Sequence, residues 1–155
     1  MEQQSFQSLS VKYPYKPFPL SHTDPVTKLD YAWMPALTVF ISYNGKRSVP
    51  LESIVDTGAG YCIFDAGIAD GLGIPLREGE QVNFSGIARG AETTGYVHTV
   101  TLTVAAQSYE APIVFAYGLS VTGILGQVGF FDHFIVTFDW TPHPPGFDVQ
   151  RILRI

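Results

Sequence analysis

One short stretch of the sequence combines residue types that can carry acid–base chemistry. An apolar run ends at Asp56, and the four residues Thr-Gly-Ala-Gly (57–60) follow it directly. A carboxylate at the point where a buried strand meets a turn can accept a phosphoryl group, belong to a phosphate-binding loop, or act as an acid or base. It can also be an ordinary turn residue, because Asp and Gly both favour turns.

The two phosphate interpretations fail on the neighbouring residues. A phosphoryl-accepting Asp of the haloacid dehalogenase type needs a second Asp two residues later, and Gly58 stands at that position. The phosphate loops of actin-like ATPases come in pairs, in two duplicated domains. A chain of 155 residues is too short for that, and Asp-Thr-Gly occurs in it once. The acid–base and turn interpretations of Asp56 remain.

The elements that must position Asp56 follow a period of two, which is typical of strands. Residues 37–43 alternate, and the Asn-Gly-Lys at 44–46 indicates a hairpin turn. One segment favours a short helix that two glycines interrupt, residues 65–74, and a helical turn is expected at residues 129–134. The other expected strands are 50–55, 61–64, 81–85, 93–104, 111–117, 135–139 and a terminal 151–155.

Many short strands, Gly/Pro turns and little helix predict an all-β protein, either a sandwich or a partly closed barrel. The strand at 93–104 is apolar on one side and rich in threonine on the other, which suits a sheet with one buried face. Residues 1–35 are rich in proline and polar groups and predict an extended arm, leaving 36–155 as the domain.

Four features in a fixed order give the chain a family resemblance. They are an apolar strand with Asp-Thr-Gly-Ala (54–59), an apolar stretch (61–64), a glycine-bracketed hairpin tip (85–90), and a Gly-Ile-Leu-Gly segment followed by a short helix and a strand (123–139). In this combination the sequence resembles the retropepsin-like aspartic peptidases, the single-lobe retroviral type, as a bacterial member.

The resemblance implies a retropepsin-like lobe: a small closed or partly open β-barrel with a flap hairpin and one short helix. It implies an aspartic endopeptidase acting on peptide or protein substrates, with no cofactor and no metal ion. Two carboxylates held close together cannot both ionise, so one can serve as base and the other as acid. This chain supplies one such group, so the second would be Asp56 of another copy in a two-fold homodimer.

The resemblance also assigns roles within the loop. Asp56 would be catalytic, the Thr57 hydroxyl would bond across the dimer axis, and Gly58 would let two backbones approach closely. Ala59 and Gly60 would lie against the substrate backbone.

A second set of roles falls outside the loop. Gly86, Ile87 and Ala88 would form the flap tip that closes over the substrate. Leu125 and Gly126 would pack behind the catalytic loop and support it.

Two positions depart from the retroviral pattern. Retroviral members often have Asp after Asp-Thr-Gly-Ala and Arg after the later Gly, and these two side chains pair. Here the positions hold Gly60 and Gln127, so both partners are absent together and no charge is left unpaired. The departure leaves open an alternative: a catalytically weak or inactive peptide-binding or dimerisation module with the same fold. A purely structural role, docked through the N-terminal arm, is a third hypothesis.

Composition and net charge limit the kinds of partner that we expect. Charged residues make up 15% of the chain and the net charge is −5, so the field repels nucleic acid rather than attracting it. No signal pattern begins the sequence and no apolar run is long enough to span a bilayer, which predicts no membrane association and a cytoplasmic location.

The remaining chemical groups are weaker candidates. Cys62 is the single cysteine, and we expect a small buried residue rather than a nucleophile. His98 lies on the apolar side of a strand and is expected to be half-buried with its hydrogen bond satisfied. Asp132 is expected to cap or solvate a helical turn, and Asp139 to end a strand. The four histidines show no metal-binding spacing: His22, His98, His133 and His143.

Overall fold

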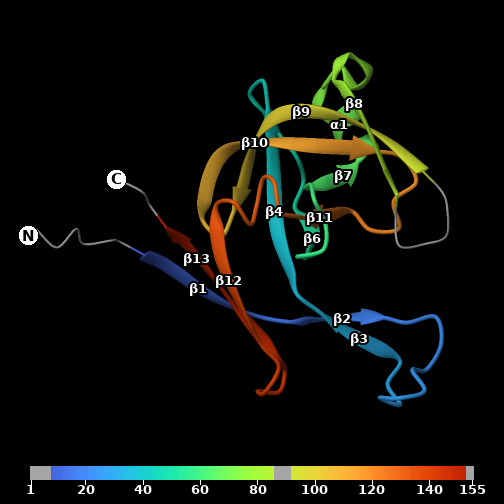
Figure 1. Cartoon of the computed structure of the whole chain (residues 1–155), viewed down its shortest axis with the longest axis vertical. Helices are drawn as coiled ribbons and strands as arrows, with labels where there is room; N and C mark the ends of the chain where they lie inside the picture. The colour runs from blue at the N-terminus through green and yellow to red at the C-terminus, as the bar shows by residue number, and fades with distance from the viewer. Residues whose placement is uncertain (1–7, 86–91, 153–155) are drawn as a thin grey trace, which may run out of the picture. The chain divides into compact units, whose positions relative to one another are not determined.

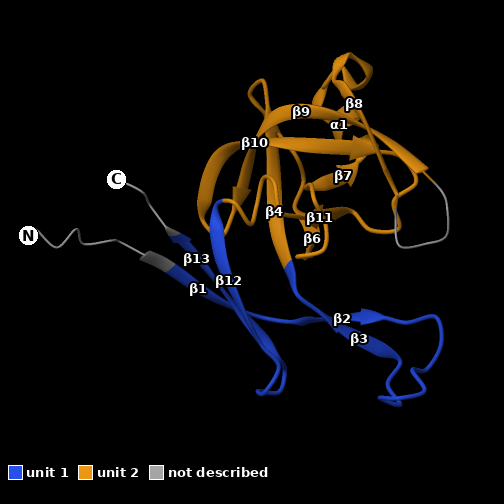
Figure 2. Ribbon diagram, viewed as in Figure 1, with its two compact units in different colours: residues 1–36, 133–155 blue, residues 37–132 orange. Residues whose placement is uncertain are grey.

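The computed structural model describes residues 8–85 and 92–152. The chain forms two compact units, one of residues 1–36 with 133–155 and one of residues 37–132 (Figure 2).

The unit of residues 37–132 is built on one sheet whose strand order is β5-β4-β6-β11-β7-β10-β9-β8 (Figure 1). An additional pairing of β4 with β9 joins two distant strands of this order, so the sheet closes into a six-stranded barrel. The strands are β4 (Ala36–Tyr43), β5 (Lys46–Arg47), β6 (Leu51–Val55), β7 (Ile63–Asp65), β8 (Glu80–Ser85), β9 (Glu92–Val104), β10 (Gln107–Ala116) and β11 (Gly123–Leu125). The all-β prediction and the closed barrel are confirmed.

The alternating residues of these strands fill the barrel. In β4, Leu37, Val39 and Ile41 are buried, as the period of two predicts. The last four residues of β10 are all buried, so both faces of this part of the strand are shielded from solvent. Three phenylalanines are fully buried: Phe64, Phe115 and Phe130.

The expected short helix is present as α1 (Ala66–Leu72). It begins at Asp65, whose carboxylate Oδ2 accepts the backbone N–H of Gly67 at 2.9 Å. It ends at Gly73, whose left-handed conformation (φ 72°) is the usual way for glycine to stop a helix. A single 3₁₀ turn, η1 (Leu76–Glu78), follows.

The helical turn expected at residues 129–134 is a run of hydrogen-bonded turns and not a helix. Backbone N–H groups of Phe131 and Asp132 donate to the carbonyls of Gly126 and Gln127, both at 3.1 Å and both five residues back. Gly129 adopts a φ of 105°, which is incompatible with a continuous helix. The segment is therefore a hydrogen-bonded turn leading into β12 (Phe134–Asp139).

The unit of residues 1–36 and 133–155 contains a three-stranded antiparallel sheet in the order β1-β13-β12 and a two-stranded hairpin, β2–β3. Tyr15, Trp140 and Phe147 pack edge to face in this unit, with ring centroids 5.3 to 5.7 Å apart. The remaining strands are β1 (Ser8–Pro14), β2 (Lys16–Pro19), β3 (Tyr31–Met34) and β13 (Gly146–Ile152).

Within the described ranges, none of the helices has both the length and the apolar character needed to cross a membrane.

Candidate active site

The site is set by two short parallel strands that end at the same level. Strand β6 pairs with β11 in a register that places Val55 beside Leu125. The next residue, Asp56, donates its backbone N–H to the Leu125 carbonyl at 3.0 Å. The segments that follow, 56–60 and 126–128, therefore leave the barrel side by side.

The Asp56 loop holds its own carboxylate in place. Oδ1 of Asp56 accepts the backbone N–H of Gly58 at 2.9 Å, and the Asp56 carbonyl accepts the N–H of Ala59 at 3.2 Å. A Cβ atom at position 58 would lie 3.3 Å from the same Oδ1 and crowd it, so glycine suits this position. Asp56 itself is half-buried, whereas Thr57 and Gly58 are exposed.

The segment after β11 fastens the loop from the other side. Backbone N–H groups of Gln127 and Val128 donate to the carbonyls of Ala59 and Gly60 at 2.8 and 3.0 Å. The Gln127 side chain adds a third bond, from Nε2 to the Thr57 carbonyl at 2.9 Å. The carbonyls of Thr57, Ala59 and Gly60 are thus hydrogen-bonded within one chain, which restrains the loop.

Leu125 and Gly126 lie where the resemblance expects support for the loop. Leu125 is fully buried. A side chain on Gly126 would collide with the backbone carbonyl oxygen of Tyr61 and come within 2.7 Å of that of Ala59. The close approach of these two segments therefore requires glycine at position 126.

This geometry is matched by the family comparison. Residues 39–128, more than half of the 155-residue chain, match the family model described as aspartyl protease. The chain belongs to the aspartyl protease family. The matched residues run from strand β4 to the turn after β11, so they include both segments of the site.

One solved structure agrees with the family on the fold. A retropepsin-like aspartic protease from Rickettsia conorii superposes with a TM-score of 0.57 at 14% identity, over 99% of this chain and 100% of that one. The chain is also similar to the retroviral protease-like domain of Ddi1 from Leishmania major (TM-score 0.49, 16% identity, 66% of this chain and 79% of that one). The EIAV protease complexed with the inhibitor HBY-793 gives a TM-score of 0.43 at 22% identity, over 61% of this chain and 82% of that one. A search of curated protein sequences found no match.

The Cys62 side chain contributes packing and hydrogen bonds to Gly126. It is fully buried, and Sγ accepts the backbone N–H of Gly126 at 3.3 Å. Burial raises the pKa of the thiol to about 12, so it stays protonated and unreactive at neutral pH. The expectation of a buried, non-nucleophilic cysteine is confirmed in its burial.

The other candidates from the sequence make their side-chain hydrogen bonds to residues outside the Asp56 loop. His98 is half-buried, and its Nε2 lies 2.8 Å from the Leu76 carbonyl, as expected of a satisfied histidine. Asp132 accepts the Gly129 N–H at 3.0 Å and so caps the turn before β12. Asp139 ends β12. No group of three or more potential metal ligands occurs in residues 8–85 and 92–152. The flap residues Gly86, Ile87 and Ala88 fall outside the described residues.

Two features near the loop were not predicted from sequence. One is the bond from the Gln127 side chain to Thr57; the sequence marked Gln127 only as a departure from the retroviral pattern. The other is a pair of exposed apolar side chains, Tyr61 and Val128, which form a parallel bridge beside the loop and are 41% and 42% exposed. A short Gly-Gln-Val run after β11 carries no local signal for either contact.

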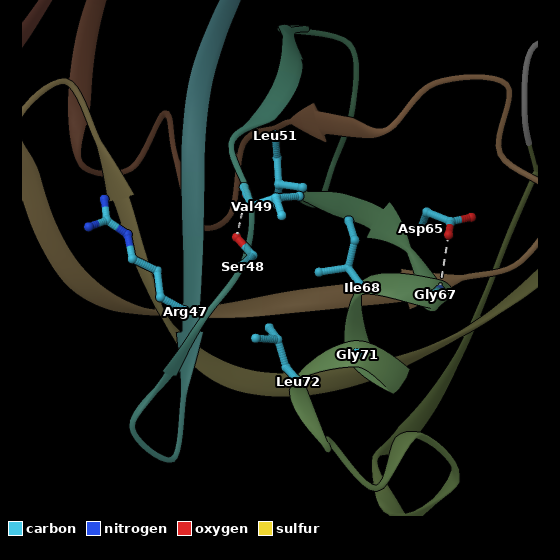
Figure 3. A pocket seen from close by; sticks show the side chains of 9 residues that line it. All are labelled: Arg47, Ser48, Val49, Leu51, Asp65, Gly67, Ile68, Gly71 and Leu72. Carbon is cyan, nitrogen blue, oxygen red and sulfur yellow. Dashed lines mark hydrogen bonds between the residues drawn. The ribbon is translucent and has the colours of Figure 1, made fainter.

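A separate cavity of about 360 Å³ lies in the same unit, between α1 and the segment that leads into β6. Figure 3 shows the side chains of Val49, Leu51, Ile68 and Leu72 around it, while the Asp65 carboxylate turns toward Gly67 at its rim. None of the predicted site residues lines this cavity.

Proposed function

We propose that the protein is an aspartic endopeptidase whose active site forms between two copies of the chain, with one Asp56 carboxylate from each. The observation that carries the proposal is the Asp56 loop: a half-buried carboxylate held on a hydrogen-bonded loop whose outer residues, Thr57 and Gly58, are exposed and small. The family match supports the peptidase class. One Asp-Thr-Gly per chain supports a shared site.

In this proposal, the second copy of the chain covers the surface beside the Asp56 loop. Tyr61 and Val128 expose apolar side chains next to the loop, and in the proposed dimer the partner covers them. In the proposed dimer the two Thr57 hydroxyls bond across the axis, and Gly58 permits the close approach of the two loops. Residues 36–155 form the peptidase domain in this proposal and residues 1–35 an extended arm.

The proposed chemistry needs only the two carboxyl groups and a water molecule. The ionised carboxylate takes a proton from the water as its oxygen attacks the peptide carbonyl carbon, and the protonated partner donates its proton to the carbonyl oxygen. The tetrahedral intermediate then collapses: the C–N bond breaks, the nitrogen receives a proton from the carboxyl that took it from water, and the hydroxyl proton returns to the other carboxylate. The pair ends with one proton, as it began.

Substrate contacts follow from the same arrangement. Ala59 and Gly60 lie against the substrate backbone, because neither has a side chain that would obstruct an extended peptide. Gly86, Ile87 and Ala88 close over it as a flap. Leu125 and Gly126 support the loop from behind.

Subunit mixing tests the shared site directly. Wild-type protein and the Asp56→Asn variant are mixed, allowed to exchange subunits, and assayed for cleavage of an unstructured peptide. If each site needs two Asp56 carboxylates, an equal mixture retains roughly a quarter of the wild-type rate, because only wild-type homodimers are active. A site complete within one chain retains roughly half.

Two other outcomes would overturn the proposal. Clean cleavage by Asp56→Asn alone would show that Asp56 is not catalytic. No cleavage by wild-type protein, together with equal affinity for a peptide and for its hydroxyl-bearing tetrahedral mimic, would identify a binding module instead, since a catalyst binds the mimic far more tightly.

A further inference from the structure

The peptide group between Thr57 and Gly58 is bonded at both of its ends. Its N–H donates to Oδ1 of Asp56 at 2.9 Å, and its C=O accepts from Nε2 of Gln127 at 2.9 Å. A trans peptide unit is planar and rigid, so its N–H and C=O cannot turn independently. Any group that fixes the direction of the carbonyl therefore also fixes the N–H that holds the Asp56 carboxylate.

Gln127 is well placed to fix that direction. Its own backbone N–H donates to the Ala59 carbonyl at 2.8 Å, and the glycine before it has no room for a side chain. The backbone that carries Gln127 is thus held against the loop independently of its side chain. Donation to the carbonyl also polarises the peptide group and strengthens the hydrogen bond that the N–H at its other end donates.

We infer that Gln127 is a positioning residue, which orients the Asp56 carboxylate through the Thr57–Gly58 peptide plane. The inference rests on the proposed function insofar as Asp56 is catalytic. All the bonds involved lie within one chain. The carboxylate is therefore oriented before any partner binds. The donor is a neutral amide, so salt weakens this hydrogen bond less than it weakens an exposed ion pair.

Two substitutions distinguish the hydrogen bond donated by the Gln127 side chain from simple packing of that side chain. Gln127→Met keeps the length of the side chain and removes the donor. Gln127→Glu keeps the shape but can donate to the Thr57 carbonyl only while its carboxyl group is protonated, below a pH of about 4.3. The position is exposed, so both proteins should fold.

We expect Gln127→Met to lower kcat for peptide cleavage by about three- to tenfold with little change in KM, as befits the loss of one hydrogen bond. The rate of Gln127→Glu, divided by the wild-type rate at each pH, should approach one in acid and fall to the Gln127→Met level as the carboxyl ionises. The ratio for Gln127→Met should stay constant with pH. Equal rates for all three proteins, or a flat ratio for Gln127→Glu, would overturn the inference.

A second readout does not require activity. The ¹³C chemical shift of the Thr57 carbonyl, which reports donation to that oxygen, should move more with pH in Gln127→Glu than in Gln127→Met, because only Gln127→Glu loses a donor as the pH rises. If the shift behaves in this way while wild-type protein cleaves no peptide, the proposed function fails and the orientation of the loop by Gln127 stands. If wild-type protein cleaves peptide and the shift moves no more in Gln127→Glu than in Gln127→Met, the inference fails and the proposed function stands.

Discussion

Strands β6 and β7 end in the same local structure, at an aspartate with glycine two residues later. In the first turn Gly58 N–H donates to the Asp56 carboxylate, in the second Gly67 N–H donates to the Asp65 carboxylate, and both distances are 2.9 Å. Each aspartate also donates its own backbone N–H to a segment distant in sequence, to Leu125 and to Thr122. Up to this point nothing distinguishes the two turns.

The chain differs in what comes next. After Asp65 it continues into α1, and the carboxylate serves as the cap of that helix. After Asp56 no helix forms, and the carbonyls of the loop are satisfied by residues 127 and 128 instead. The comparison teaches that Asp-x-Gly specifies a turn, whereas the contacts made from a distant segment decide whether the carboxylate is presented or used internally.

The strongest contrast should appear in cleavage. Asp56→Asn is expected to reduce kcat/KM for an unstructured peptide by about 10³-fold or more, because an amide can neither take nor give the required proton. Asp65→Asn should change it by less than about twofold, since the amide oxygen still accepts the Gly67 N–H. Similar losses in the two variants would remove the distinction between the turns. Circular dichroism of both confirms that they are folded.

The next contrast concerns the segment that fastens the loop. Gly126→Ala is expected to lower the free energy of unfolding by about 3 kcal/mol, because the new methyl group meets two backbone carbonyls that cannot move aside easily. Gly60→Ala is the matched control: nothing lies within 4 Å of its added Cβ, and a change within about 0.5 kcal/mol is expected. Urea titration measures both. A tolerated Gly126→Ala would mean that the two segments are not tightly apposed.

The smallest contrast concerns stability, and here the substitution at Asp65 is expected to have the larger effect. Asp65→Ala removes a helix cap and is expected to cost about 1 kcal/mol of stability. Asp56→Ala should cost less, since no helix begins after Asp56 and the Gly58 N–H that it frees is exposed and can bond to water. Thermal unfolding of the two variants provides the comparison. An Asp56→Ala loss larger than that of Asp65→Ala would indicate that Asp56 is retained for the fold.

Local patterns carried much of the architecture. The strand alternation at 37–43, the short helix at 65–74 and the Asp-Thr-Gly turn each follow from near neighbours in sequence, and each is found. The helical turn expected at 129–134 does not become a helix, because Gly129 has a positive φ and the backbone bonds of this segment span five residues.

The long-range contacts could not be predicted in the same way. Sequence separates Gln127 from Thr57 by 70 positions, and Gly126 from Cys62 by 64. The parallel register of β6 and β11 brings the first pair together, and the antiparallel register of β7 and β11 brings the second. Three-residue strands such as β11 leave little pattern from which to read a register. The roles of the predicted site residues remain predictions, and those of the flap lie beyond the described residues.

The position of β6 and β11 inside the sheet has a kinetic consequence for the loop. Strand β6 lies between β4 and β11, and β11 lies between β6 and β7, so neither strand has an open edge within residues 37–132. An amide such as that of Asp56, bonded to Leu125, can meet solvent deuterium only when the strands around it separate. Its exchange rate should therefore report global unfolding of the barrel, and the loop it anchors should persist for as long as the fold itself.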